Sequence, residues 1–120
     1  MVKMIVGVEY HFNASHALEI LKEPLHGHTY EVRVEVRGEL GEGNMVVDFL
    51  ILDKIIRPLI EKLDHSHLNN LLKCSNPTAE YVAKWLADEI SKGLRERDLR
   101  VELHSIYVRE GKEGWAKIEF

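Results

Sequence analysis

Three histidines lie near one another early in the chain: His16, and the pair His26 and His28 that flanks Gly27. In an extended strand, side chains two residues apart project from the same face, roughly 6–7 Å apart. A His-Gly-His strand therefore aims both imidazoles at one point, and the glycine lets another group approach the backbone. With His16 from a neighbouring strand, the pair would form a three-ligand zinc site whose fourth position is open to water or substrate. The alternative is that each ring is a core histidine satisfied by hydrogen bonds.

The alternation of apolar and polar residues around these histidines supports the zinc interpretation. From position 2 to position 16 the even residues are mainly apolar, and most of the polar residues are odd. The same alternation runs from position 30 to position 37. A period of two is typical of half-buried strands. All three histidines have the parity of the apolar face, provided that no bulge intervenes.

Other residues could carry acid–base chemistry or bind a substrate. Asp64 precedes His65, and a carboxylate beside an imidazole can orient the ring and raise its basicity, as a general base requires. The alternative is that Asp64 caps a helix end and that His65 is a surface residue. Glu23, three residues before His26, could reach whatever the metal binds, and Glu110 follows an apolar strand. Either glutamate could instead be an ordinary solvated carboxylate.

The composition limits the classes of protein to consider. Of the 120 residues, 45% are hydrophobic and 30% are charged, so residues 1–120 are expected to form one domain with its own core. The formal net charge of -4 argues against a general nucleic-acid binder. No apolar run approaches the roughly 18 residues of a membrane span and no signal-peptide pattern is present, so we expect a cytoplasmic protein. The single cysteine, Cys74, rules out an intrachain disulfide and a cysteine-rich zinc site.

Four strands are predicted from the alternation and from the turn residues between them. These strands cover residues 2–16, 27–40, 99–109 and 115–120. A loop is predicted at residues 17–25, where Pro24 disfavours a helix just before it. The apolar parity of the third strand changes near His104–Ser105, which indicates a bulge.

Two helices are predicted between the second and third strands. Asp48 and Thr78 are good N-caps, and helical spacing of apolar residues follows each of them. The first helix should end near Asp64 and the second near Gly93. The order ββααββ predicts an α+β fold: a four-stranded antiparallel sheet with two helices on one face. Its two open edges favour self-association.

These residues together resemble the family of 6-pyruvoyl-tetrahydropterin synthase and 6-carboxy-tetrahydropterin synthase. The stretches that carry the resemblance are Phe12–His16, Leu25–Tyr30, Met45–Phe49, Leu63–Asn69, Asn76–Glu80 and the region of Glu110. They occur in the family's order and cover nearly the whole chain.

The resemblance implies the tunnelling fold, in which three ββααββ subunits join their sheets into a barrel and two trimers commonly stack as a homohexamer. It also implies a Zn2+ cofactor held by His16, His26 and His28. By the same resemblance, Asp64 and His65 match an acid–base pair contributed across the subunit interface. Glu110 matches the carboxylate that anchors the pterin.

One departure from the family's pattern bears on the reaction. Its two best-known branches place a cysteine four residues before the first histidine of the His-Gly-His, where this chain has Lys22, and Cys74 is far from the motif. Glu23 instead stands where another branch has a glutamate. That branch resembles dihydroneopterin aldolase in outcome, and it cleaves the side chain of 7,8-dihydroneopterin triphosphate to give 6-hydroxymethyl-7,8-dihydropterin.

The resemblance therefore implies a zinc-dependent lyase that acts on this pterin triphosphate, with Glu23, Asp64 and His65 as catalytic groups. A 6-pyruvoyl or 6-carboxy tetrahydropterin product is the alternative, and a non-catalytic module that binds zinc and pterin is a remoter one. The groups that could hold the triphosphate are Lys22, Arg33, Arg37 and Arg109.

Overall fold

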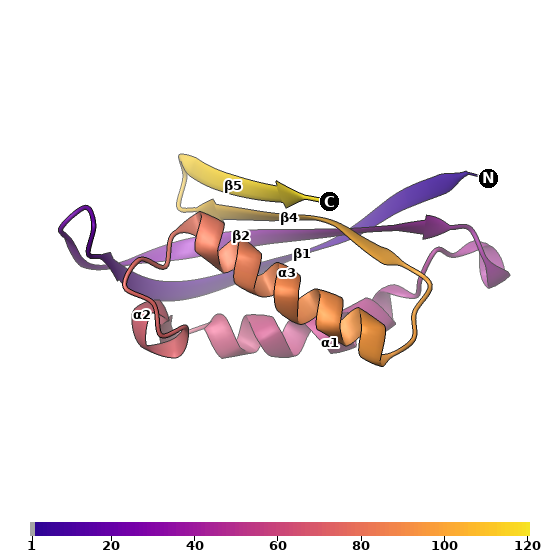
Figure 1. The fold of residues 1–120 in the computed structure, drawn as a ribbon, viewed down its shortest axis with the longest axis horizontal. Coiled ribbons are helices and arrows are strands. Elements are labelled where there is room, and N and C mark those ends of the chain that lie inside the picture. Colours follow the sequence, from indigo (N-terminus) through magenta and orange to yellow (C-terminus); the bar gives the residue numbers. More distant parts are fainter. Residues whose placement is uncertain (1) are drawn as a thin grey trace.

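The computed structural model describes residues 2–120 and contains one mixed sheet covered by helices (Figure 1). The strands are β1 (Lys3–Leu18), β2 (Glu23–Glu39), β3 (Ser66–His67), β4 (Glu102–Glu110) and β5 (Gly114–Glu119). The helices are η1 (Glu42–Asn44), α1 (Phe49–Leu63), α2 (Leu68–Leu71) and α3 (Ala79–Glu96). The order across the sheet is β3-β1-β2-β4-β5, and every pairing is antiparallel except that of β3 with β1.

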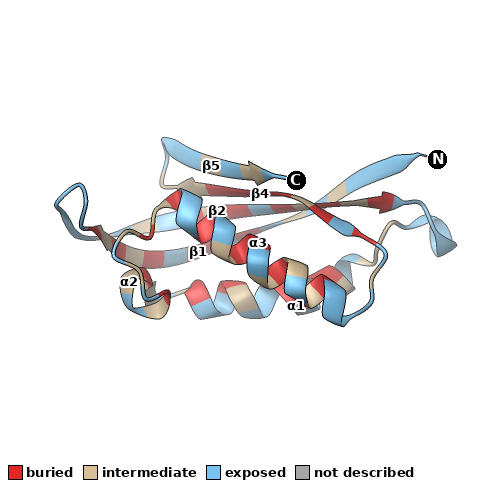
Figure 2. Cartoon of the chain, in the orientation of Figure 1, coloured by how far each residue is buried: buried red, intermediate tan, exposed pale blue. Residues whose placement is uncertain are grey.

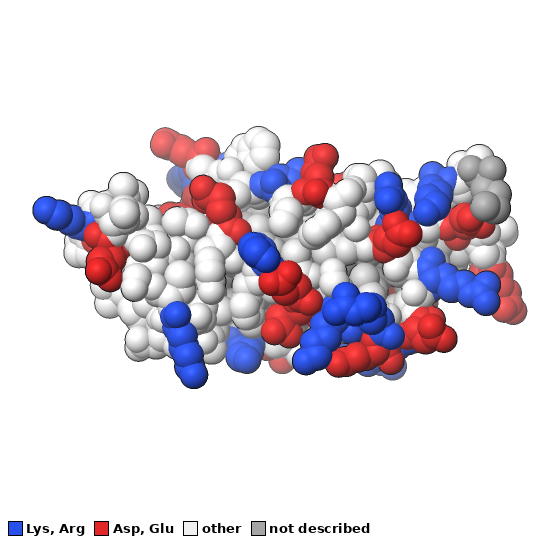
Figure 3. All heavy atoms as spheres, in the orientation of Figure 1, with Lys and Arg blue, Asp and Glu red and all other residues white. Residues whose placement is uncertain are grey.

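The predicted α+β fold is confirmed, with α1 and α3 on one face of four long strands. Figure 2 shows the buried segments on the sides of the helices and strands that face each other. The even residues of β1 from Tyr10 to Leu18 are buried, as are Tyr30 and the alternate valines that follow it in β2. Apart from His16 and Leu18, these residues form one core cluster with the apolar stripes of α1 and α3. In Figure 3 the face that carries α3 has acidic and basic side chains interspersed.

Both predicted N-caps are present. The Asp48 carboxylate accepts a hydrogen bond from the backbone N–H of Leu50 at 2.8 Å, and the Thr78 hydroxyl accepts one from Tyr81 at 3.2 Å. The predicted bulge is also confirmed: the register between β2 and β4 shifts opposite His104, which is the extra residue of β4.

Three sequence predictions about local structure are wrong. The loop expected at residues 17–25 is only a turn at 19–22, because β1 and β2 form one long hairpin that extends past the histidines. The sheet has five strands and not the predicted four, because Ser66–His67 pairs in parallel with Ala14 and Ser15 after α1, and α2 follows it. A two-residue strand has no periodicity to detect, so only the tertiary contact defines it.

Gly93 does not end α3, which continues to Glu96. A Cβ atom at this position would lie 2.6 Å from Cγ2 of Ile55 on α1, so the glycine allows the two helices to approach closely. No helix among residues 2–120 is long and apolar enough to cross a membrane.

Replacing Gly93 with alanine should therefore destabilise the protein by about 1–2 kcal/mol. Crowding against Ile55 outweighs the roughly 1 kcal/mol by which alanine favours a helix. Chemical denaturation measures the change in unfolding free energy. Gly114→Ala is the control, because a Cβ there meets nothing within 4 Å. Equal stability of the two variants would contradict the close helix contact.

Candidate metal centre and active site

The long β1–β2 hairpin brings the three histidines together on the face of the sheet that the helices cover. His16 lies directly opposite His26, and Ala14 lies opposite His28, so both pairs share one parity. The ring centroids are 4.7 to 5.1 Å apart, and the Nε2 atoms of His16 and His26 are 3.2 Å apart. The absence of a bulge between Lys3 and His16 is what keeps these side chains on one face.

Backbone carbonyls fix the orientation of two of the rings. Nδ1 of His16 lies 2.9 Å from the carbonyl oxygen of Pro77, and Nδ1 of His26 lies 2.7 Å from that of Pro24. A carbonyl can only accept, so Nδ1 carries the hydrogen, and in the neutral ring Nε2 then presents a lone pair. The hydroxyl of Tyr30, a buried residue, lies 3.3 Å from Nδ1 of His16 and restrains the same ring.

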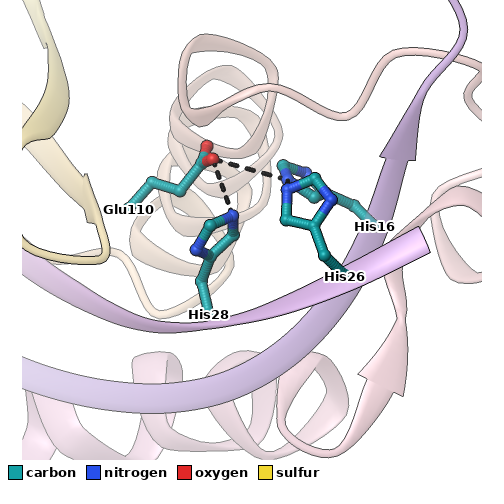
Figure 4. Close-up of side chains that lie close together, drawn as sticks. All are labelled: His16, His26, His28 and Glu110. Atoms are coloured by element: carbon teal, nitrogen blue, oxygen red, sulfur yellow. Dashed lines mark hydrogen bonds and ion pairs between the residues drawn. The ribbon is translucent and has the colours of Figure 1, made fainter. Parts of the chain in front are cut away.

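Glu110 joins this group from the end of β4, where it pairs with Tyr30 across the sheet. Its Oε1 lies 3.0 Å from Nε2 of His28 and 3.4 Å from Nε2 of His16 (Figure 4). Together, one donor atom from Glu110 and one from each of the three histidines lie within 4.8 Å of one another.

This donor set fits a metal cation. Two imidazole lone pairs 3.2 Å apart repel each other unless a cation lies between them. Nε2 of His28 is buried and has no hydrogen bond of good geometry to any residue of the described chain. Burial lowers the pKa of His28, although the negative charge of Glu110 opposes the shift, so this ring favours the neutral form that binds metal. Three imidazoles and a carboxylate are ligands that zinc accepts.

Asp64 and His65 lie just past the end of α1 and are held by β1. The Asp64 carboxylate accepts a hydrogen bond of 2.8 Å from the backbone N–H of Asn13 and lies 3.3 Å from Nδ1 of His65. The backbone N–H of His65 donates to the carbonyl of Asn13 at 2.6 Å, and His65 has a φ of 55°. The Asp64 carboxylate thus orients the exposed imidazole of His65, and hydrogen bonds to the backbone of Asn13 hold both residues.

Within one chain, the Asp64–His65 pair is not part of the four-residue cluster. His65 and His28 nevertheless line the same open hollow of about 700 Å³, together with hydroxyl-bearing residues such as Ser15 and Thr29. Of the pair and the cluster, only His65 and His28 line this hollow, and neither Asp64 nor His65 contacts the cluster.

Glu23 begins β2, three residues before His26, and is exposed. Its negative charge acts on His28 in the direction that raises the pKa of that ring. With Lys22 and Pro24, Glu23 lines a second hollow of about 490 Å³ beside the β1–β2 turn. Cys74 is half-buried and packs against the core.

Sequence reasoning missed the groups that orient the histidines. A carbonyl such as that of Pro24 or Pro77 leaves no signal in a sequence, because every residue has one. Tyr30 could have been found, since it shares the parity of the histidines and its hydroxyl needs a partner when buried.

Comparison with known proteins decides the family. A model of the family described as 6-pyruvoyl tetrahydropterin synthase matches residues 5–119. The chain belongs to this family. The resemblance read from the sequence is thereby confirmed.

Two relatives show which members of the 6-pyruvoyl tetrahydropterin synthase family the chain is similar to. A dihydroneopterin monophosphate aldolase of Pyrococcus furiosus is 38% identical over 110 residues, which is 91% of each chain. A putative 6-carboxy-5,6,7,8-tetrahydropterin synthase of Archaeoglobus fulgidus is 34% identical over 119 residues, covering 97% of this chain and 96% of the relative.

Solved structures in the family share the fold. The 6-pyruvoyl tetrahydropterin synthase of Caenorhabditis elegans superposes with a TM-score of 0.85 at 20% identity, covering 100% of this chain and 97% of the other. A catalytic-residue mutant of the Plasmodium vivax enzyme, in which alanine replaces a glutamate, superposes with a TM-score of 0.78 at 19% identity, covering 98% of each chain. The fold is therefore that of the tunnelling-fold pterin synthases.

Proposed function

We propose that this protein is a zinc-dependent aldolase that cleaves the side chain of a phosphorylated 7,8-dihydroneopterin to give 6-hydroxymethyl-7,8-dihydropterin. The observation that carries the proposal is the exposed Glu23 at the start of β2, three residues before His26, with the single cysteine, Cys74, packed against the core elsewhere. The relative from Pyrococcus furiosus is an aldolase of dihydroneopterin monophosphate, which supports the same reaction.

The number of phosphates on the substrate is a separate question. The sequence led us to expect the triphosphate, whereas the name of the Pyrococcus furiosus relative specifies the monophosphate. Cleavage between the first two side-chain carbons leaves the phosphate ester at the far end unchanged, so the chemistry is the same for both. Both esters belong in the test.

His16, His26 and His28 would hold the zinc ion. When bound, the ion supplies a Lewis acid that makes the hydroxyls of the substrate side chain more acidic. Glu110 would anchor the pterin, because a pterin presents adjacent N–H donors and one carboxylate can accept two of them as charge-assisted hydrogen bonds.

Glu23 and His65 would move the protons. A base removes the proton from the 2′-hydroxyl, the bond between carbons 1′ and 2′ breaks, and the 2′ carbon leaves as an aldehyde. The dihydropterin ring accepts the electron pair, and a proton is then delivered to carbon 1′. His65, oriented by Asp64, is one acid–base group, and Glu23 is the other.

Lys22 is the best candidate for holding the phosphate. Arg33 and Arg37 each form ion pairs with glutamates of the sheet, and Arg109 donates to the carbonyl of Lys112. Lys22 forms no ion pair within residues 2–120 and lines the hollow that Glu23 also lines.

A second candidate function is 6-carboxy-tetrahydropterin synthesis. The relative from Archaeoglobus fulgidus carries that name as a putative function, and it covers almost the whole chain. This second function would yield a pterin with a carboxyl group where the aldolase product has a hydroxymethyl group, so the two products differ in mass and charge.

Incubation of the zinc-loaded protein with dihydroneopterin monophosphate and with the triphosphate tests the proposal. We expect 6-hydroxymethyl-7,8-dihydropterin from at least one of them, identified by chromatography and mass spectrometry. A 6-carboxy or 6-pyruvoyl product would replace the proposal with the second candidate or its 6-pyruvoyl relative. No turnover of either ester would favour a binding module.

The protein should assemble into a homotrimer or a hexamer. Within the described residues, β1 pairs along its outer edge only at Ala14 and Ser15, and β5 forms the other open edge of the sheet. Two open edges favour pairing with a neighbouring copy. Light scattering should report three or six times the chain mass of 13.9 kDa. A fully active monomer would contradict a site shared between subunits.

A further inference from the structure

We propose, building on the function above, that Glu110 is an exchangeable fourth metal ligand, released when its carboxylate binds the pterin ring. Recognition of the ring would then open the metal to the hydroxyls of the substrate. Glu110 would act both as a ligand and as an anchor, in succession.

Three of the six separations between the donor atoms are close to those of a tetrahedral site. Four ligands at about 2.0 Å from zinc lie roughly 3.3 Å from one another in a tetrahedron. Nε2 of His16 is 3.2 Å from Nε2 of His26, and Oε1 of Glu110 is 3.0 Å from Nε2 of His28 and 3.4 Å from Nε2 of His16. The carboxylate oxygen thus lies at the separation expected between two ligands of one metal from the donor atoms of both His28 and His16.

A hydrogen bond to the histidines does not explain this position of Glu110. The hydrogen of His16 is on Nδ1, where Pro77 accepts it, so its Nε2 is an acceptor. A carboxylate oxygen facing that lone pair at 3.4 Å gains nothing without a cation between them. His28 also forms no well-directed hydrogen bond from Nε2, although Oε1 of Glu110 is the nearest carboxylate oxygen.

Four protein ligands close a zinc site, whereas catalysis requires an open position. Glu110 can leave at low cost only if another partner takes its charge. The adjacent N–H donors of the pterin are such a partner, and about a quarter of the Glu110 side chain is exposed, so a ligand can reach it. A molecule with suitable hydroxyls and no pterin ring would meet a closed metal.

The first test compares zinc affinity by competition with a chelator, without any substrate. Glu110→Gln should bind zinc at least about 10-fold more weakly than the wild type, since even lost outer-shell partners cost 10- to 100-fold. Saturating zinc should still give one ion per chain, because the three histidines remain. Glu113→Gln, an exposed carboxylate in the following turn, is the matched control and should bind zinc like the wild type. Equal affinity of Glu110→Gln and the wild type would overturn the proposal.

The second test uses the visible spectrum of the cobalt-substituted protein, which reports the ligands of the metal. 6-Methyl-7,8-dihydropterin has the ring and lacks side-chain hydroxyls, so it cannot take the metal position through them. Adding it should change the wild-type spectrum and leave that of Glu110→Gln unchanged. If circular dichroism shows that Glu110→Gln is unfolded, the wild-type titration alone decides, and an unchanged spectrum with the pterin bound would overturn the exchange.

These results are independent of the reaction. Absence of product with the expected zinc and cobalt results would remove the proposed aldolase activity and leave the ligand exchange standing. If the wild type forms the product and Glu110→Gln binds zinc as tightly as the wild type, only the ligand exchange would be removed.

Discussion

Replacing Glu23 with alanine should lower turnover by about 100-fold or more while zinc and pterin binding are retained. This is the usual size of an acid–base contribution. Glu23 is exposed at the start of β2, so its loss leaves no cavity and should not change the fold. Steady-state kinetics of the zinc-loaded protein measure the loss, and a fall in kcat at constant zinc content is the expected pattern.

Glu19→Ala is the matched control, because Glu19 is an exposed carboxylate in the turn that joins β1 to β2. It should keep wild-type turnover. Near-normal turnover of Glu23→Ala would leave His65 as the proton carrier and would remove the reason for preferring the aldolase reaction over that of the synthases.

Replacing His28 with alanine should remove both the metal and the activity. The wild type should hold about one zinc per chain, and a site with one imidazole fewer should retain almost none after dialysis. The fold should persist, because the core is built from Phe12, Tyr30 and the helix residues that pack on them. Elemental analysis measures the zinc, and circular dichroism checks the fold.

His11→Ala serves as the control for the loss of one histidine. His11 lies on β1 with the opposite parity and is exposed, so it should keep full zinc content. Full zinc in His28→Ala would place the metal elsewhere. Unfolding of the wild type on zinc removal would instead indicate a structural site.

The sequence predicted the arrangement of the histidines because strand parity is a local property. His16, His26 and His28 lie on one face since β1 and β2 pair without a register shift from Lys3 to His16. The bulge at His104 was also predictable, because an extra residue reverses the apolar parity of a strand.

The features that the sequence did not reveal depend on contacts between distant segments. The placement of Glu110 among the histidines follows from the register of β4 against β2, which no local pattern specifies. Gly93 has the composition signal of a helix end, yet its role is the approach of α1 at Ile55. The two-residue strand β3 exists only because it contacts β1.

The fate of the phosphate is the measurement that tests the proposed reaction most directly. Zinc-loaded protein and dihydroneopterin monophosphate would be followed by phosphorus nuclear magnetic resonance, with the pterin product identified in parallel. Cleavage between carbons 1′ and 2′ leaves the phosphate on the two-carbon fragment, so the expected products are glycolaldehyde phosphate and 6-hydroxymethyl-7,8-dihydropterin in equal amounts. Release of inorganic phosphate together with a pterin that keeps all three side-chain carbons would contradict the aldolase reaction.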